Sequence, residues 1–206
     1  MGLISFLKAL PIDVGQGNRR FDTKGKIIAR RLVPEDGAGK TLLDIGCREG
    51  AQSRMFEEAG YEVTSLDIDK RYEKCVVHDC NERLPFDDSS FDVIWSSEVI
   101  EHLVNAEEVA HDLRRVLKPG GRLVLTTPNS FPFYFCLLAA IGMTPQKIQR
   151  ADHLHFFDRI QMSRLFPDAR IYGFLPFTIL RPRISCGVGW LSPTFVISET
   201  RAVADE

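Results

Sequence analysis

The sequence lacks any hydrophobic run long enough to form a membrane-spanning helix. No stretch of its 206 residues reaches the roughly 18 to 20 apolar residues that a bilayer requires. The first residues, MGLISFLKALP, have neither a basic leader nor a small-residue cleavage site, and Phe6 stands where a myristoylation motif needs Ser or Thr. We therefore expect neither a signal peptide nor a transmembrane segment.

Paired cysteines and a strong net charge are also missing. The five cysteines are irregularly spaced and form no CxxC pair, which argues against a disulfide framework and a zinc site and favours a cytoplasmic protein. A net charge of -2 provides no long-range attraction to nucleic acid or anionic lipid, so a nucleic-acid partner is disfavoured. The chain length suits one domain with a full hydrophobic core.

Short apolar runs instead alternate with helical patterns along most of the chain. We predict helices at 22–32, 51–59, 106–117 and 157–166, and strands at 41–45, 61–66, 74–78, 91–96, 122–127, 169–180 and 195–200. The Lys118–Gly121 sequence is expected to stop the third helix. Strands that alternate with helices through short links predict a Rossmann-like, doubly wound α/β fold with a mostly parallel sheet.

Acidic residues and glycines follow the predicted strands, where open parallel sheets bind ligands. Asp44 ends the first strand and is followed by the turn glycines Gly46 and Gly50. Asp67, about twenty residues on, suits the two hydroxyls of a ribose, and Asp79 suits an adenine amino group. This pattern favours S-adenosylmethionine as the ligand. The turn DIGCREG lacks G-x-G-x-x-G, which argues against a nicotinamide-dependent dehydrogenase.

Four segments between residues 41 and 129 resemble one known family. They are LLDIGCREG, LDID, HDCNERLPFDDSSFDVIWSSEVIEHL and LRRVLKPGGRLVLTTPN. The sequence resembles the class I S-adenosylmethionine-dependent methyltransferases, in particular the small-molecule type of quinone-biosynthesis O-methyltransferases. The resemblance implies a seven-stranded, mostly parallel sheet with an antiparallel last strand near 195–200. We divide the single expected domain into a lead-in (1–40), a cofactor-binding core (41–129), a lid or acceptor insertion (130–156), and a C-terminal helix and strands (157–206).

The resemblance also implies which residues bind the cofactor. Asp44 and Gly46 would lie near the methionine portion, Asp67 would hold the ribose, and Asp79 would lie beside the adenine. The full predicted set is Asp44, Gly46, Cys47, Arg48, Gly50, Asp67, Ile68, Asp79, Cys80, Ser96 and Glu98.

Arg48 departs from the family pattern D-x-G-x-G-x-G because it replaces the middle glycine. A positive φ at a residue other than glycine costs on the order of 1 kcal/mol or more. The turn must therefore use an ordinary φ at Arg48 or tolerate strain. Three alternatives stay open for its side chain: it pairs with the cofactor carboxylate, it faces solvent on an intact turn, or it impairs the cofactor site.

The segment EVIEH after the fourth strand holds two carboxylates and an imidazole. If it opens a helix, Glu98, Glu101 and His102 share one face, an arrangement that suits a divalent metal or acid–base chemistry. It resembles the metal site of some small-molecule and small-RNA 2′-O-methyltransferases, with His153 or His155 as a further ligand. Acidic residues also favour a helix N-terminus without any metal, and this second interpretation is the stronger one. His153 and His155 should point the same way if their segment is extended.

Methyl transfer needs mainly positioning of the two reactants, and it needs a base only for a weakly acidic hydroxyl. The candidate bases are His102, His153 and His155, because histidine changes charge near neutral pH. Phe131, Phe133, Tyr134 and Phe135 in the insertion indicate a small or lipid-like acceptor, although a helix on the core or a homodimer interface would show the same pattern.

The sequence therefore favours methylation of a small or amphipathic acceptor, at oxygen. A non-catalytic relative that binds S-adenosylmethionine or a partner is an alternative. A nucleic-acid or protein methyltransferase is a third, disfavoured because there is no basic run and no Asn-Pro-Pro-Tyr motif. The protein would be a monomer or a homodimer, and Leu3–Leu10 together with the insertion leaves peripheral membrane contact open.

Overall fold

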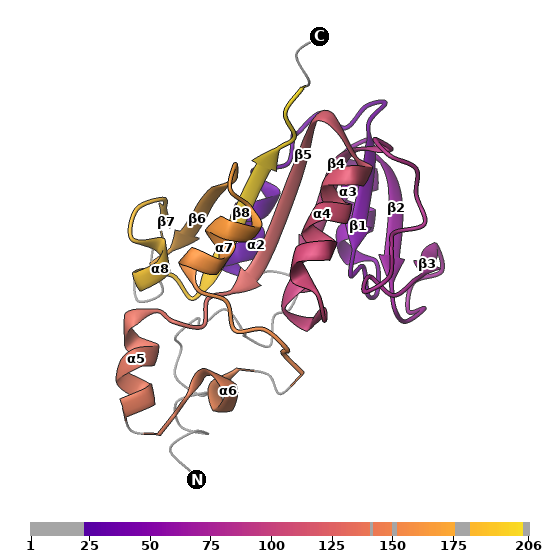
Figure 1. Cartoon of the computed structure of the whole chain (residues 1–206). Helices are drawn as coiled ribbons and strands as arrows, with labels where there is room; N and C mark the ends of the chain where they lie inside the picture. The colour runs from indigo at the N-terminus through magenta and orange to yellow at the C-terminus, as the bar shows by residue number, and fades with distance from the viewer. Residues whose placement is uncertain (1–22, 141, 150–151, 176–181, 204–206) are drawn as a thin grey trace.

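The structure is a computed structural model that describes residues 23–140, 142–149, 152–175 and 182–203 (Figure 1). The apolar segment Leu3–Leu10 lies outside these residues. The strands are β1 (Thr41–Ile45), β2 (Glu62–Asp67), β3 (Cys75–Val77), β4 (Phe91–Ser97), β5 (Leu117–Pro128), β6 (Arg170–Phe174), β7 (Arg183–Ile184) and β8 (Thr194–Thr200). The helices are α2 (Lys24–Arg30), α3 (Ala51–Glu58), the 3₁₀ helix η1 (Ile100–His102), α4 (Ala106–Val116), α5 (Phe133–Ala140), α6 (Pro145–Ile148), α7 (Arg159–Leu165) and α8 (Val188–Leu191).

All described strands form one sheet in the order β3-β2-β1-β4-β5-β8-β6-β7. Strands β3, β2, β1, β4 and β5 are parallel, and β8 is antiparallel to both β5 and β6. The Rossmann-like fold and the antiparallel last strand are confirmed. The sheet has eight described strands rather than the expected seven. The additional strand is the two-residue β7, which pairs with Gly173 and Phe174 of β6 at the outer edge.

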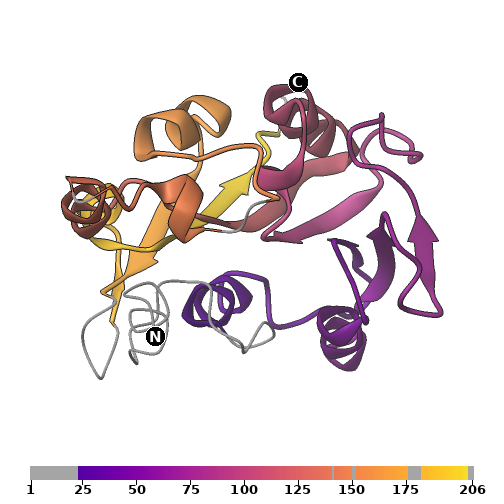
Figure 2. The ribbon, with the colours of Figure 1, turned by 90° about the horizontal axis from the view of Figure 1, so that it is seen from below.

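The sheet is buried between two helical layers (Figure 2). Helices α2 and α3 cover one face, and α4 and α7 cover the other. Within β1, Leu42 packs into the first layer and Leu43 into the second, because alternate side chains of a strand point to opposite faces. A parallel strand that is buried on both faces reads as a continuous apolar run, which is why the bounds of β1 could be predicted without error.

Helix α4 forms where its sequence pattern predicts it, whereas the strand after it, β5, begins earlier than predicted. The Asn105 side chain caps the helix by accepting from the backbone of Glu108 (3.3 Å). The helix ends at Val116, as expected, but the next residues form no separate turn. Strand β5 begins at once with a register shift opposite β4, and Gly120 N donates to Arg201 O (2.9 Å). Pairing with distant residues therefore overrides the turn tendency of Lys-Pro-Gly-Gly.

The segment after β5 extends away from the sheet. Helices α5 and α6 lie below the main body in Figure 1, beyond the ends to which the parallel strands point. No helix among the described residues is long and apolar enough to cross a membrane. The strand expected at 169–180 forms β6, and its last part falls in residues 176–181, outside the described ranges.

Candidate active site

The turn between β1 and α3 is held tightly against its neighbours. Gly46 N and Cys47 N both donate to Leu66 O, at 2.8 and 3.2 Å. Gly46 has φ 77, and a Cβ there would lie 2.5 Å from the Val99 side chain. Gly50 has φ 74, and a Cβ there would lie 2.5 Å from the Tyr72 ring. Both glycines are thus required by conformation and by close approach.

Arg48 adopts a positive φ of 50°, so of the two alternatives that the sequence left open for this turn, the structure has the strained one. Its backbone N–H donates to Asp67 Oδ2 at 2.9 Å. A hydrogen bond to a charged acceptor is worth roughly 1.5–3 kcal/mol, which offsets the conformational cost of about 1–2 kcal/mol. The strained residue therefore holds the carboxylate at the end of β2 in place.

Carboxylates at the ends of β2 and β3 are fixed by backbone donors. Asp67 Oδ1 accepts a second bond from Asp69 N at 3.1 Å, and Asp79 Oδ1 accepts from Asn81 N at 2.9 Å. Each carboxylate oxygen can accept more than one bond, so Asp67 retains capacity for ribose hydroxyls. The neighbouring Ile68 side chain is 63% exposed and offers an apolar surface beside this position.

Asp44 is buried at the end of β1 and lies in a chain of hydroxyl donors. Ser53 Oγ donates to Asp44 Oδ2 at 2.6 Å, and Ser65 Oγ donates to Ser53 Oγ at 2.8 Å. Burial raises the pKa of Asp44 to about 6, although the bond from Ser53 and the charge of Lys26 oppose this effect. A desolvated carboxylate in this position suits a bound ammonium group.

The two predicted cysteines contribute packing rather than charge. Burial raises the pKa of the Cys47 thiol far above its ordinary value, and it raises that of Cys80 to about 12. Cys80 and Ser96 line a cavity of about 360 Å³ between α4 and the end of β4, together with Leu103. Asp44 and Asp67 do not line this cavity.

No helix begins at Glu98 directly after β4, although the shared face considered from the sequence required one. Glu98 has φ 58, its N–H donates to Thr126 O (2.9 Å), and the helical turn η1 starts only at Ile100. The expected helical face of Glu98, Glu101 and His102 therefore does not form. The structure instead groups Glu101, His102 and His153, whose ligand atoms all lie within 4.8 Å of one another.

His102 has a defined hydrogen-bond partner. Its Nδ1 lies 2.9 Å from the backbone O of Asp152, and a carbonyl can only accept. In neutral His102 the hydrogen is therefore on Nδ1, which leaves the lone pair on Nε2. The ring packs edge-to-face on His153, with 4.8 Å between ring centroids.

Backbone contacts bring the two histidine segments together. Glu101 is 1% exposed and accepts a hydrogen bond from Thr127 Oγ1 at 3.0 Å. Its backbone O accepts from Leu154 N and His155 N, at 2.9 and 3.0 Å. The segment that follows β4 is thus hydrogen-bonded to residues about fifty positions further along the chain.

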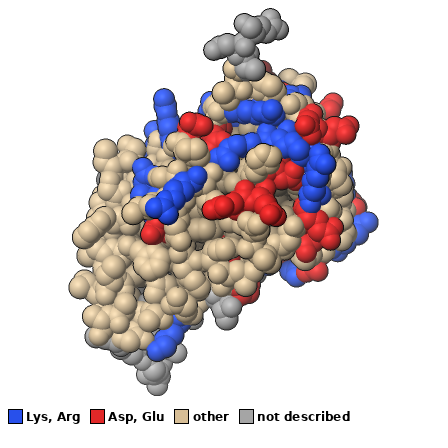
Figure 3. Space-filling model, in the orientation of Figure 1, with Lys and Arg blue, Asp and Glu red and all other residues tan. Residues whose placement is uncertain are grey.

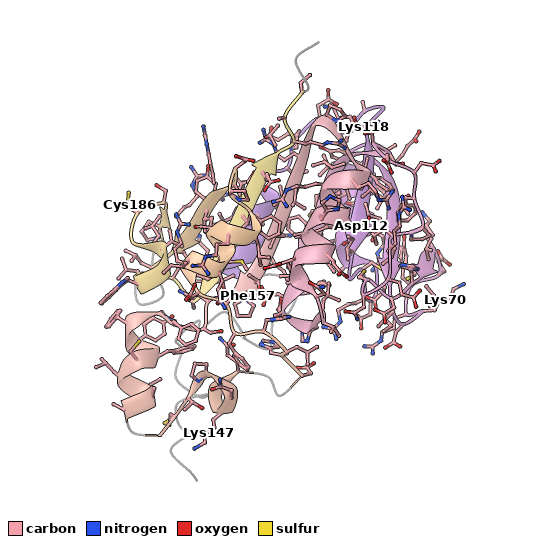
Figure 4. All side chains as sticks on the ribbon, viewed as in Figure 1. Lys70, Asp112, Lys118, Lys147, Phe157 and Cys186 are labelled. Atoms are coloured by element: carbon pink, nitrogen blue, oxygen red, sulfur yellow. The ribbon has the colours of Figure 1, made fainter. Side chains whose placement is uncertain are left out.

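His155 differs from His153, so the two do not share one direction. Its ring stacks on Phe157 (5.3 Å), which lies just below α7 in Figure 4, and its Nε2 lies 3.3 Å from Val104 O. His153 is buried against His102. The His102–His153 pair is therefore the stronger candidate for acid–base chemistry.

Lys26 is a candidate site residue that the sequence did not reveal. The run of cations around it indicated only a solvated face of α2, yet Lys26 is partly buried. Burial lowers its pKa, while Glu98 and Asp44 raise it and Arg48 lowers it further. No local signal distinguishes Lys26 from Lys24, because only the packing of α2 decides which one faces the sheet edge.

These groups fit S-adenosylmethionine. The fixed carboxylate of Asp67 suits the ribose, exposed Ile68 suits the adenine, and buried Asp44 suits the methionine ammonium. Cations lie within the same cluster, at Lys26 and Arg48.

Comparison with known proteins agrees with the fold and with S-adenosylmethionine as the methyl donor. A family profile described as a methyltransferase domain matches residues 18–170. The chain is 36% identical over 113 residues to a demethylmenaquinone methyltransferase of Tropheryma whipplei, covering 47% of each chain. It is 31% identical over 122 residues to a ubiquinone biosynthesis O-methyltransferase of Dechloromonas aromatica, covering 51% of each. A crystal structure of an S-adenosylmethionine-dependent methyltransferase from Archaeoglobus fulgidus superimposes with a TM-score of 0.66 at 19% identity, over 89% of this chain and 97% of the other.

The chain belongs to the methyltransferase-domain family, because the profile covers well over half of its length. It is an S-adenosylmethionine-dependent methyltransferase domain, and two of its distant relatives are named for demethylmenaquinone methylation and ubiquinone biosynthesis. The chain spans about half the length of the curated relatives that it matches.

Proposed function

We propose that the protein transfers a methyl group from S-adenosylmethionine to an oxygen of a lipid-like, quinol-type acceptor, with His102 as the general base. The sulfonium of the cofactor supplies an already activated methyl group, so the protein mainly positions the acceptor and removes its proton. The observation that carries this proposal is the hydrogen bond between His102 Nδ1 and Asp152 O. It fixes the tautomer in which Nε2 accepts a proton.

The environment of His102 supports this role. The ring is partly exposed and follows β4, close to the edge where Asp44 and Asp67 end their strands. Its edge-to-face contact with His153 restricts its orientation. A general base near neutral pH is commonly a histidine that donates from one ring nitrogen to a carbonyl and accepts a proton at the other.

The insertion after β5 supports an apolar acceptor. Helix α5 carries no charged residue, and Phe133 and Leu137 on it are 37% and 66% exposed. In Figure 3 charged side chains gather over the upper and right part of the face, whereas the lower left, around α5, is mostly uncharged. Lys147 on α6 is the labelled charge in this region (Figure 4). An exposed apolar surface beside an active site fits a hydrophobic acceptor better than a polar metabolite.

The relatives support the acceptor class. Two of them are named for menaquinone and ubiquinone biosynthesis, which involve phenolic rings with isoprenoid tails. Such rings offer both hydroxyl oxygens and ring carbons. A base beside the acceptor favours oxygen, because a phenol must lose its proton to become a strong nucleophile.

The test is methyl transfer from labelled S-adenosylmethionine to short-chain demethylated quinols, followed by mass spectrometry of the product. We expect His102→Gln to lower kcat about 10²- to 10⁴-fold without changing the affinity for S-adenosylhomocysteine. His155→Gln, at the histidine that packs on Phe157, is the matched control and should retain activity.

Three results would contradict this proposal in different ways. Methylation at carbon would exclude the oxygen acceptor. Activity that depends on added Mg²⁺ and is lost on chelation would assign Glu101, His102 and His153 to a metal site instead. Cofactor binding without turnover on any quinol, or a partner protein in place of an acceptor, would indicate a non-catalytic relative.

A further inference from the structure

We infer that the Lys26 ammonium binds the α-carboxylate of the methionine portion of S-adenosylmethionine. The inference rests on the proposed function and names the residue that recognises the amino-acid end of the methyl donor. It is argued from the placement of helix α2, from the direction of its side chains and from the charges around Lys26.

Helix α2 begins at the edge of the sheet where the cofactor binds. A Cβ on Gly25 would lie 2.9 Å from Thr194 Cγ2, and Thr194 pairs with Pro128 at the end of β5. Beyond the other end of the helix, Arg122 Nη1 donates to Leu32 O at 3.3 Å. The helix therefore runs antiparallel to β5, and its first turn, which contains Lys26, lies at the carboxyl edge of the sheet.

The side chain of Lys26 points toward the glycine turn. Residues 26 and 30 are one helical turn apart and share a face. Arg30 Nη1 lies 3.6 Å from Met55 Sδ on α3, which places that face toward α3 (Figure 2). Lys26 is one turn closer to the carboxyl edge than Arg30. It therefore faces the start of α3, directly after Gly50.

The charges around Lys26 match the two ends of an amino acid. Asp44 and Glu98 interact favourably with the Lys26 ammonium, whereas Arg48 repels it. The cluster thus combines two acids with two cations at one edge of the sheet. A methionine zwitterion complements it when its ammonium faces Asp44 and its carboxylate faces Lys26. Because the position is partly desolvated, this pairing is stronger than it would be in water.

Lys26 is better placed than Arg48 for this contact. The backbone of Arg48 is already committed to Asp67, on the ribose side of the turn. Lys26 approaches from α2, which lies beside α3 on the same face of the sheet, and its flexible four-carbon stem can follow the ligand carboxylate.

The experiment compares two ligands that share adenosine and sulfur. S-adenosylhomocysteine carries the amino-acid end, and 5′-methylthioadenosine lacks it. Isothermal titration of the full chain should show that Lys26→Met weakens S-adenosylhomocysteine binding about 10- to 100-fold, since a hydrogen bond to a charged group is lost. The affinity for 5′-methylthioadenosine should change less than about twofold, and Lys26→Arg should restore most of the lost affinity.

Lys24→Met is the matched control, because it removes the same charge from the same helical turn on a different face. It should leave both affinities unchanged. Equal losses for the two ligands with Lys26→Met would assign Lys26 to the folding of α2 and overturn the inference, as would an unchanged affinity for S-adenosylhomocysteine. A wild-type protein that binds neither ligand would overturn the proposed function, and the assignment of Lys26 with it.

Discussion

The turn after β1 and helix α5 lie near the same edge of the sheet but are held in different ways. The turn is fixed by backbone bonds from Gly46 and Cys47 to Leu66 O, and by the bond from Arg48 N to Asp67. Helix α5 buries Phe135 among its described side chains, while Leu137 is 66% exposed. The turn after β1 is therefore part of the core, whereas α5 packs on the outside of it.

This difference separates the recognition of the donor from that of the acceptor. The proposed cofactor site consists of backbone and carboxylates that the sheet fixes, so folding creates it. The proposed acceptor site lies beside a segment whose apolar side chains remain exposed after folding. Changes near the donor site should therefore affect both stability and binding, whereas changes on α5 should affect acceptor use alone.

The largest difference should appear in stability. We expect Leu43→Ala, at a fully buried position of β1, to lower the free energy of unfolding by about 2–5 kcal/mol through lost burial and a residual cavity. Leu137→Ala on α5 should change it by no more than about 0.5 kcal/mol, because the side chain is already exposed. Urea titration followed by circular dichroism measures both. A similar loss for both variants would show that α5 belongs to the folded core.

A smaller effect should separate two neighbouring carboxylates of the donor site. Asp67 is the residue assigned to the ribose, and its carboxylate accepts from Arg48 N, so Asp67→Asn should lower the affinity for S-adenosylhomocysteine by about 1.5–3 kcal/mol. Asp69→Asn, at an exposed residue of the same loop, should have little effect. Calorimetric titration of each variant gives the comparison. If the Asp69 variant loses as much affinity as the Asp67 variant, the ribose assignment is wrong.

The smallest effect concerns pH. In the proposed orientation of the methionine portion, only ionised Asp44 attracts its ammonium, and burial raises the pKa of Asp44 to about 6. The affinity for S-adenosylhomocysteine should therefore rise with pH and be about tenfold higher at pH 7 than at pH 5. In the free protein the same raised pKa stabilises the fold at low pH. That contribution is present below the unfolded value of 3.8 and is lost as pH rises through about 6.

Asp44→Asn provides the control for this pH dependence. It should bind S-adenosylhomocysteine more weakly but with nearly the same affinity at pH 5 and pH 7. A variant that keeps the wild-type pH profile would place the titrating group elsewhere, for example on the ligand itself.

Most of the fold could be predicted because its signals are local. The apolar run of β1 and the periodic apolar residues of α4 each lie within a dozen positions, and both elements were placed within a residue of their ends. The edge strand β7 could not be predicted, since its two residues carry no periodic pattern and pair only because β6 is already in place.

The candidate site shows the same division. The acids at the ends of β1 and β2 follow from strand ends, which the sequence marks clearly. A shared face for Glu98, Glu101 and His102 depended on a helix that begins at Glu98, whereas Glu98 adopts a positive φ and His153 takes its place in the group. The contact between His102 and Asp152 joins residues fifty positions apart, a separation over which no spacing rule applies.

The sequence by itself thus determined the strand–helix alternation, the position of the glycine turn and the carboxylates Asp44 and Asp67, because each depends on neighbours along the chain. Only the tertiary structure decided that Arg48 accepts a strained φ, since the compensating acceptor Asp67 lies on another strand. Only the tertiary structure decided that Lys26, rather than Lys24, lies among the charges of Asp44, Glu98 and Arg48. The packing of Gly25 against Thr194 sets the rotation of α2, and that rotation depends on two segments that lie far apart in the sequence.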